Sequence, residues 1–103
     1  MTQDDLYIMQ MAVTGDIKVG RSQDPERRLK QLQTGAPHRL KILLVAPGLG
    51  YQERHVHQVL HHCRNRGKRG EWFSEDALGS VPDHLFEMFP VEILEDPDWW
   101  KVL

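Results

Sequence analysis

The sequence IKVGRSQDPERR, residues 17–28, contains the clearest structural signal in this chain. Ile17 and Val19 alternate with Lys18 and Gly20, which predicts a short half-buried strand. A helix should then start at Asp24-Pro25, because aspartate can accept a hydrogen bond from the first turn and proline fits the first helical position. Four cations surround this junction: Lys18, Arg21, Arg27 and Arg28. Such a cluster beside a helix N-terminus suits a polyanion.

An apolar stretch at residues 6–11 predicts a first strand, joined to residues 17–20 through a turn at Thr14-Gly15. A loop of even length would place Tyr7 on the same sheet face as Lys18, and an odd loop would separate them. Taken alone, Tyr7 is typical of an ordinary half-buried strand tyrosine. The hairpin register therefore decides whether a phenol and an ammonium share one surface.

The first helix is expected at residues 25–34 and should end at Gly35, a favoured C-terminal residue. Leu29 and Leu32 mark its buried stripe. Arg28 lies four residues before Leu32 and flanks that stripe, whereas Arg27 is rotated toward solvent. Arg28 is thus the better candidate for an inward functional cation, although a solvated helix arginine is the ordinary alternative.

The rest of the chain predicts a third strand at residues 40–46, central because it is nearly continuously apolar, a helix at 51–63 and a short helix at 82–89. The order β-β-α-β-α indicates an α+β fold, a small three-stranded antiparallel sheet flanked by helices. Residues 1–90 are expected to form one domain. Residues 91–103 form a short C-terminal extension, an acidic tail that could add an edge strand, bind a partner or be loose.

The helix at 51–63 carries an apolar stripe at i, i+3, i+4 and i+7, made of Val56, Val59, Leu60 and Cys63. Glu53 and His57 lie on the same side of the helix. A carboxylate on an apolar stripe needs a partner, since burying an unpaired charge costs several kcal/mol or shifts the pKa. A divalent metal would supply one, and a partly exposed first-turn glutamate is the equal alternative.

Two histidines of this helix, His57 and His61, have the H-x-x-x-H spacing of a zinc peptidase. Gln58 stands where the catalytic glutamate of such an enzyme would be. Zinc held by His57, His61 and Cys63 is a weaker alternative than a histidine-rich helix near phosphate.

The charge is unevenly distributed: residues 18–70 hold twelve of the thirteen lysines and arginines but three of the fifteen acidic residues. This asymmetry indicates a nucleic-acid face beside an acidic tail. The residues expected to contact nucleic acid are Arg21, Arg27, Arg64, Arg66, Lys68 and Arg69. The last four belong to a glycine-containing loop in which cations would meet phosphates.

Length and composition indicate the setting. The 103 residues contain one cysteine, Cys63, and no run near the ~20 apolar residues of a membrane helix. We expect a single cytoplasmic protein domain with no membrane partner. A homodimer or a larger protein partner stays open.

Four short motifs resemble the GIY-YIG nuclease superfamily. LYI, with Tyr7, stands for the first motif, and KVG, ending at Gly20, stands in place of the YIG motif. Arg28 follows Gly20 by eight residues, Glu53 and His57 come next, and Glu71-Trp72-Phe73 follows a glycine. The pattern is most similar to the short phage and bacterial branch and spans residues 6–73.

This resemblance implies a metal-dependent DNA endonuclease. Tyr7 would be the base or would position the attacking water, with its pKa lowered by Lys18 and a metal. Arg28 would bind the phosphate, and Glu53 would hold one Mg²⁺ or Mn²⁺ ion. His57 would assist the leaving group or contact the ligands of the metal ion. The alternative is a non-catalytic DNA-binding or regulatory module that keeps the fold and the basic face.

Overall fold

A computed structural model describes residues 3–64 and 72–101 of the chain. Its elements, in chain order, are β1 (Asp5–Met11), β2 (Ile17–Ser22), α1 (Pro25–Gly35), β3 (Leu40–Ala46), η1 (Gly50–Gln52), α2 (Glu53–Leu60), η2 (His61–Cys63), β4 (Trp72–Phe73), η3 (Glu75–Ser80), α3 (Asp83–Phe86) and α4 (Val91–Glu95), where η marks a 3₁₀-helix. The predicted α+β class and the β-β-α-β-α order are confirmed.

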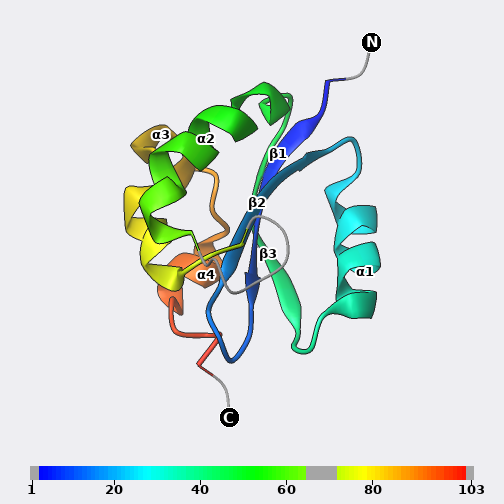
Figure 1. Ribbon diagram of the computed structural model, residues 1–103, viewed down its shortest axis with the longest axis vertical. Helices are drawn as coiled ribbons and strands as arrows, with labels where there is room; N and C mark the ends of the chain where they lie inside the picture. The colour runs from blue at the N-terminus through cyan, green and yellow to red at the C-terminus, as the bar shows by residue number, and fades with distance from the viewer. Residues whose placement is uncertain (1–2, 65–71, 102–103) are drawn as a thin grey trace.

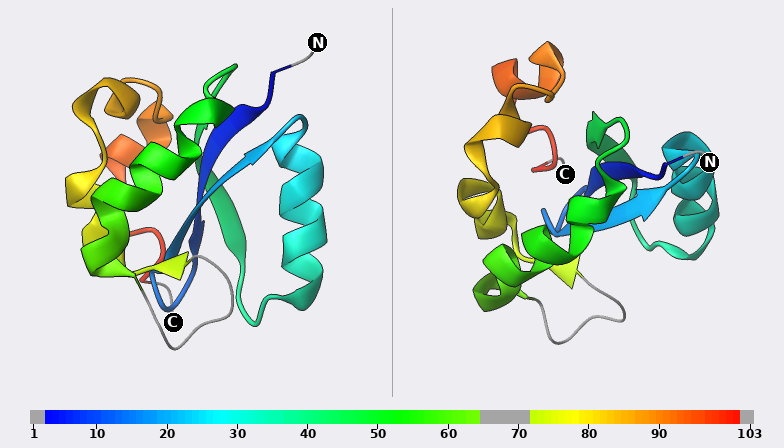
Figure 2. Two further views of the ribbon diagram at one scale, coloured as in Figure 1. Left: turned by 45° about the horizontal axis from the view of Figure 1, so that its top comes forward. Right: turned by 90° about the horizontal axis from the view of Figure 1, so that it is seen from above.

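The four described strands form one antiparallel sheet in the order β3-β1-β2-β4. Helix α1 lies on one side of this sheet, and α2, α3 and α4 lie on the other (Figure 1). The turned views in Figure 2 show the same separation. The result is a three-layer arrangement in which the two sheet faces have different neighbours.

The prediction of three strands is wrong, because Trp72 and Phe73 add a fourth by pairing with Lys18 and Ile17. A two-residue strand is too short to show the alternation by which strands are recognised in a sequence. The prediction that residues 40–46 form the central strand is also wrong. β3 lies at the sheet edge, and its long apolar run arises because α1 contacts β3 while Leu43 and Leu44 enter the core.

A bulge in the β1–β3 pairing explains how two consecutive leucines both become buried. Ile8 pairs with Leu44 and Met9 pairs with Ile42, so Leu43 is an extra residue in its strand. Extra residues of this kind disturb the regular alternation of side chains. Leu43 and Leu44 are both completely buried in the core.

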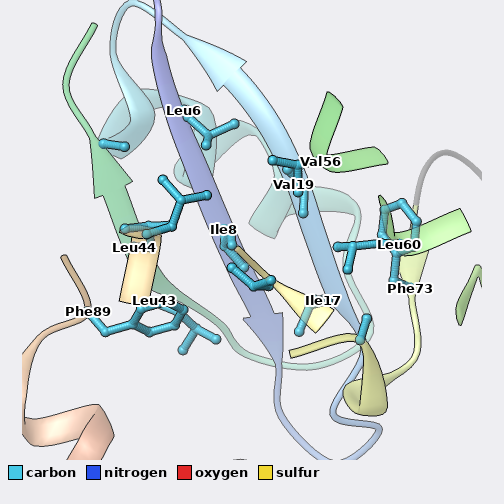
Figure 3. Packing of buried hydrophobic residues seen from close by; sticks show 14 of the residues in the cluster. Leu6, Ile8, Ile17, Val19, Leu43, Leu44, Val56, Leu60, Phe73 and Phe89 are labelled. Atoms are coloured by element: carbon cyan, nitrogen blue, oxygen red, sulfur yellow. The ribbon is translucent and has the colours of Figure 1, made fainter. Parts of the chain in front are cut away.

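The main core lies between the sheet and the layer of α2, η3, α3 and α4, and Figure 3 shows part of it. Its members include Leu6, Ile8, Ile17, Val19, Leu43, Leu44, Val56, Leu60, Phe73, Phe89 and Ile93. By contrast, Pro25 is the one buried residue of α1, so Leu29 and Leu32 are half-buried rather than the buried stripe we expected. Helix α1 therefore buries little of its own side-chain surface, although Tyr7, Met9 and Met11 on the sheet face that it covers are buried.

The segment after Pro90 continues the core instead of leaving it. Ile93 of α4 is buried, and the half-buried Trp99 packs against the same cluster. The backbone N–H of Val13 in the β1–β2 turn donates to the Trp100 carbonyl at 2.7 Å. Residues 91–95 form a helix, so neither an edge strand nor a loose tail describes them.

Gln10 is the polar link between this C-terminal segment and the sheet. Its side chain is 1% exposed; its Nε2 donates to the Gly15 carbonyl at 3.0 Å and its Oε1 accepts from Trp99 Nε1 at 2.9 Å. Nothing in the sequence identified this residue, because an isolated glutamine in a strand normally indicates a solvated position.

We expect Gln10→Met to lower the free energy of unfolding by about 1–3 kcal/mol. The variant keeps the side-chain length but leaves the buried Trp99 N–H without its acceptor, and orphaned buried donors carry that cost. Chemical denaturation of Gln10→Met, Trp99→Phe and the double variant would measure it. If the two single losses simply add, the bond between these side chains does not couple them.

Candidate active site

The register of the β1–β2 hairpin places Tyr7 directly opposite Gly20. Six residues lie between the paired Gln10 and Ile17, so the loop has an even length and Tyr7 shares a sheet face with Lys18. Tyr7 is 2% exposed. A Cβ built on Gly20 would lie 2.9 Å from Cε2 of Tyr7 and closer still to its hydroxyl. The missing side chain at Gly20 is therefore what allows the phenol to lie across β2.

We expect Gly20→Ala to destabilise the protein by about 1–3 kcal/mol, since overpacking a fixed aromatic ring has that cost. Gly79→Ala is a matched control, because a Cβ at Gly79 meets no atom within 4 Å among the described residues. Urea denaturation of both variants would compare them. Equal stabilities would show that Tyr7 does not occupy the space above Gly20.

Two helix starts bring opposite charges to the Tyr7 hydroxyl. Arg28 lies in the first turns of α1, and Glu53 is the first residue of α2. Burial is the largest effect and raises the pKa of Tyr7 above its ordinary value. The Arg28 side chain, which hydrogen-bonds the hydroxyl, lowers this pKa, and the negative charge of Glu53 raises it. Arg28 and Glu53 are thus both close enough to act on Tyr7, although the three residues are distant in sequence.

The helix starts are fixed locally. The Asp24 carboxylate accepts from the Arg27 N–H at 3.1 Å and Pro25 occupies the first turn, as predicted. Arg28 Nη1 donates to Gln31 Oε1 at 3.3 Å, one turn further along α1. Sequence reasoning did not single out Gln31, which the i, i+3 spacing could have indicated. The side chains of Arg28 and Gln31 are both exposed.

The expectation that the pKa of Tyr7 falls is wrong for this structure, because burial dominates and raises it. The effect assigned to Lys18 is wrong as well, since the cation that lowers this pKa is that of Arg28. Lys18 shares the face of Tyr7 but pairs with Met9, and its Nζ lies over the Trp72 ring, 5.7 Å from the centroid.

His57 anchors α2 to the sheet. Its Nε2 lies 2.7 Å from the Val19 carbonyl oxygen, so this nitrogen carries the proton and donates. The ring also packs against Phe73 at a centroid distance of 5.4 Å. With 9% exposure, His57 is part of the packing between α2 and β2.

The predicted nucleic-acid contacts fall in three places. Arg21 forms an ion pair with Asp4, with Nε 2.8 Å from Oδ2. The side chain of Arg27 is exposed on α1, and the guanidinium of Arg64 lies 5.8 Å from the Phe73 ring centroid. Arg66, Lys68 and Arg69 lie outside the described residues.

The described side chains offer few ligands for a metal ion. No group of three histidine, cysteine, aspartate or glutamate side chains within residues 3–64 and 72–101 could hold a metal ion. The zinc alternative at His57, His61 and Cys63 is therefore unsupported. Glu53 is half-buried beside Tyr7 and fits a hard, largely hydrated cation, which needs one or two carboxylates together with substrate phosphate.

Together these features define a small α+β domain with a phenol, a guanidinium and a carboxylate gathered at one place on its sheet. The family model of the T5orf172 domain matches residues 6–97, and the chain belongs to this family. No curated protein and no solved structure matches the chain. Membership of this family supports a nucleic-acid-related role.

The family match also corrects the resemblance drawn from the short motifs, because the T5orf172 domain is a different family from the GIY-YIG nucleases. The KVG motif belongs to a strand that leads into a turn, and the EWF motif contains two adjacent aromatic residues. Both features also occur in unrelated hairpins that are followed by a helix. The family match therefore assigns no role to Tyr7, Arg28 or Glu53.

Helices long and apolar enough to cross a membrane are absent from the described part of the chain.

Proposed function

We propose that this protein is an endonuclease that hydrolyses DNA phosphodiester bonds with the help of Mg²⁺ or Mn²⁺. The observation that carries the proposal is the convergence of Arg28 and Glu53 on the buried Tyr7 hydroxyl. These three ionisable groups come from three separate elements, β1, α1 and α2. A titratable group whose pKa is shifted by burial and by specific charged neighbours, as that of Tyr7 is, is more frequent at functional sites than elsewhere.

Each group has a chemical task in phosphodiester hydrolysis, which develops extra negative charge on the phosphate. The Arg28 guanidinium is always charged and binds two phosphate oxygens in a planar fork. The Tyr7 hydroxyl, like any tyrosine whose pKa is not strongly lowered, keeps its proton at neutral pH, and it would orient the attacking water by hydrogen bonding. Glu53 would hold the divalent cation, which supplies charge to the phosphate and acidifies water when bound.

The basic part of the surface supports DNA as the substrate. Arg27 is exposed next to Arg28 on α1, and residues 18–70 carry nearly all the cations of the chain. Phosphate contacts from such residues supply affinity that does not depend on sequence. His57 contributes by fixing α2, and therefore Glu53, to β2.

The proposal is tested by plasmid nicking with Mg²⁺, Mn²⁺ or EDTA, comparing wild type with Glu53→Ala. We expect metal-dependent conversion of supercoiled to open-circular DNA by the wild type and a loss of it in the variant. Glu26→Ala, at an exposed first-turn glutamate of α1, is the matched control and should keep full activity. Nicking that survives Glu53→Ala, or no nicking with either metal, contradicts the proposal.

A second function, a DNA-binding module without catalysis, is favoured by one observation. Within the described residues, Glu53 is the one carboxylate that acts on Tyr7, a small donor set for a metal. Such a module would bind DNA with an affinity that falls with salt, by a log–log slope of about −0.9 per neutralised phosphate. Salt-dependent binding together with no cleavage in the nicking assay would identify it.

A further inference from the structure

Among the described residues, the face of the sheet that carries Tyr7 has a groove. Its volume is about 470 Å³, and it lies beside the C-terminal half of α1. Leu32, Gly35 and Pro37 line one side, and Met11 of β1 and Trp72 of β4 line the other. Nothing in the reaction proposed above uses this groove.

Trp72 lies on the same sheet face as Tyr7. Lys18 pairs with Trp72, Gly20 pairs with Tyr7, and residues two apart on β2 point to the same face. Phe73, the next residue, is completely buried in the core on the opposite face. The indole is half-buried and borders the groove, and the Lys18 ammonium lies over its ring.

The distance between the two sites suits a nucleic-acid strand. Trp72 lies two strands away from Tyr7, at about 4.8 Å per strand, and is displaced by two residues along the strand direction, at about 3.3 Å per residue. The distance between the two residues is therefore roughly 12 Å. A stacked strand rises about 3.4 Å per nucleotide, so this is a span of a few nucleotides. Lys18 lies between them in the register, with its ammonium near the indole. An aromatic ring beside cations is the usual arrangement for binding a base and its backbone together.

We propose that Trp72 is a stacking platform for one unpaired base of the DNA that is held at Tyr7 and Arg28. The inference rests on the proposed function in one respect, namely that a DNA phosphate lies at that site. A base inside a duplex is already stacked on both sides and has no free face to offer. The substrate class is therefore DNA with an unpaired nucleotide a few positions from the phosphate that is cut.

Binding without metal tests this proposal separately from cleavage. The probes are three fluorescein-labelled duplexes: fully paired, with one bulged adenine, and with one bulged abasic nucleotide. Fluorescence anisotropy in EDTA measures their affinities. Wild type should bind the adenine bulge about tenfold more tightly than the abasic bulge, since stacking on an aromatic side chain contributes about that much.

Three variants sharpen the test. Trp72→Leu should bind both bulges equally, and Trp72→Phe should keep most of the preference. Gly35→Leu should also lose it by filling the groove, and a side chain is tolerated there because a Cβ at Gly35 meets no atom within 4 Å among the described residues. Circular dichroism checks that each variant is folded.

Two outcomes would overturn the platform: equal binding of adenine and abasic bulges by wild type, or a preference that persists in both Trp72→Leu and Gly35→Leu. Failure of the proposed nuclease gives a different result. In that case the adenine preference and its dependence on Trp72 are present, while plasmid nicking is absent with every divalent metal.

Discussion

Arg28→Ala is expected to lower DNA cleavage by a factor of about 10²–10³ while weakening DNA binding only a few-fold. The guanidinium hydrogen-bonds the Tyr7 hydroxyl, so it lies at the place where the phosphate is proposed to react. A fixed cation stabilises the additional charge of the transition state more than the ground-state diester. Losing one such group typically costs this much in rate.

Arg27→Ala is the matched control, one position along the same helix. Both arginines are exposed, but Arg28 acts on Tyr7 and Arg27 is not among the groups that do, so Arg27→Ala should weaken binding and keep the cleavage rate at saturating DNA. Single-turnover kinetics with anisotropy titrations separate the two effects. Arg28→Lys should recover little activity, because an ammonium cannot reproduce the planar fork. Parallel loss of binding in both alanine variants, with unchanged rates at saturation, would remove Arg28 from the reaction.

Local sequence patterns predicted the parts of this fold that depend on neighbouring residues. The alternation around Ile17 and Val19 and the Asp24-Pro25 start were enough to place β2 and α1. The helix at 51–63 is helical throughout, but it is α-helical only over α2, with 3₁₀ turns on both sides. These features are decided within a few residues, which is why they could be read from the sequence.

Features that depend on distant segments could not be predicted. The strand β4 exists because β2 has a free edge at Ile17 and Lys18, and two residues carry no pattern of their own. The edge position of β3 was hidden because covering a strand on both faces gives the same apolar run as a central position. The role of Gln10 requires Trp99, which is 89 residues away.

The candidate site shows the same division. Helical phase correctly favoured Arg28 over Arg27 as the cation that faces the sheet, and it set Glu53 on the same side of its helix as Val56. The direction of the Tyr7 pKa shift was wrong, since it follows from burial that the sequence alone does not give.

Tyr7→Phe is expected to lower cleavage by about 10²–10⁴, the usual contribution of a group that transfers or positions a proton. The variant removes one oxygen and keeps the ring that lies across Gly20, so the fold should persist. Tyr51→Phe is the control, because Tyr51 is 69% exposed and its oxygen accepts from the Gln52 side chain. Its cleavage should match wild type.

The raised pKa of Tyr7 makes a second, independent measurement possible. In the unfolded chain tyrosine ionises near pH 10, whereas the folded protein holds the Tyr7 proton to a higher pH. Above about pH 10 the folded state therefore binds more protons than the unfolded state, and stability must fall as pH rises. The Tyr7→Phe variant should lack this part of the loss of stability at alkaline pH. In a Tyr51→Phe variant, Tyr7 is the remaining tyrosine, so the absorbance at 295 nm should report the ionisation of Tyr7 alone. A midpoint below pH 10 would mean that Arg28 outweighs burial, and the phenolate would then become the base in the cleavage reaction.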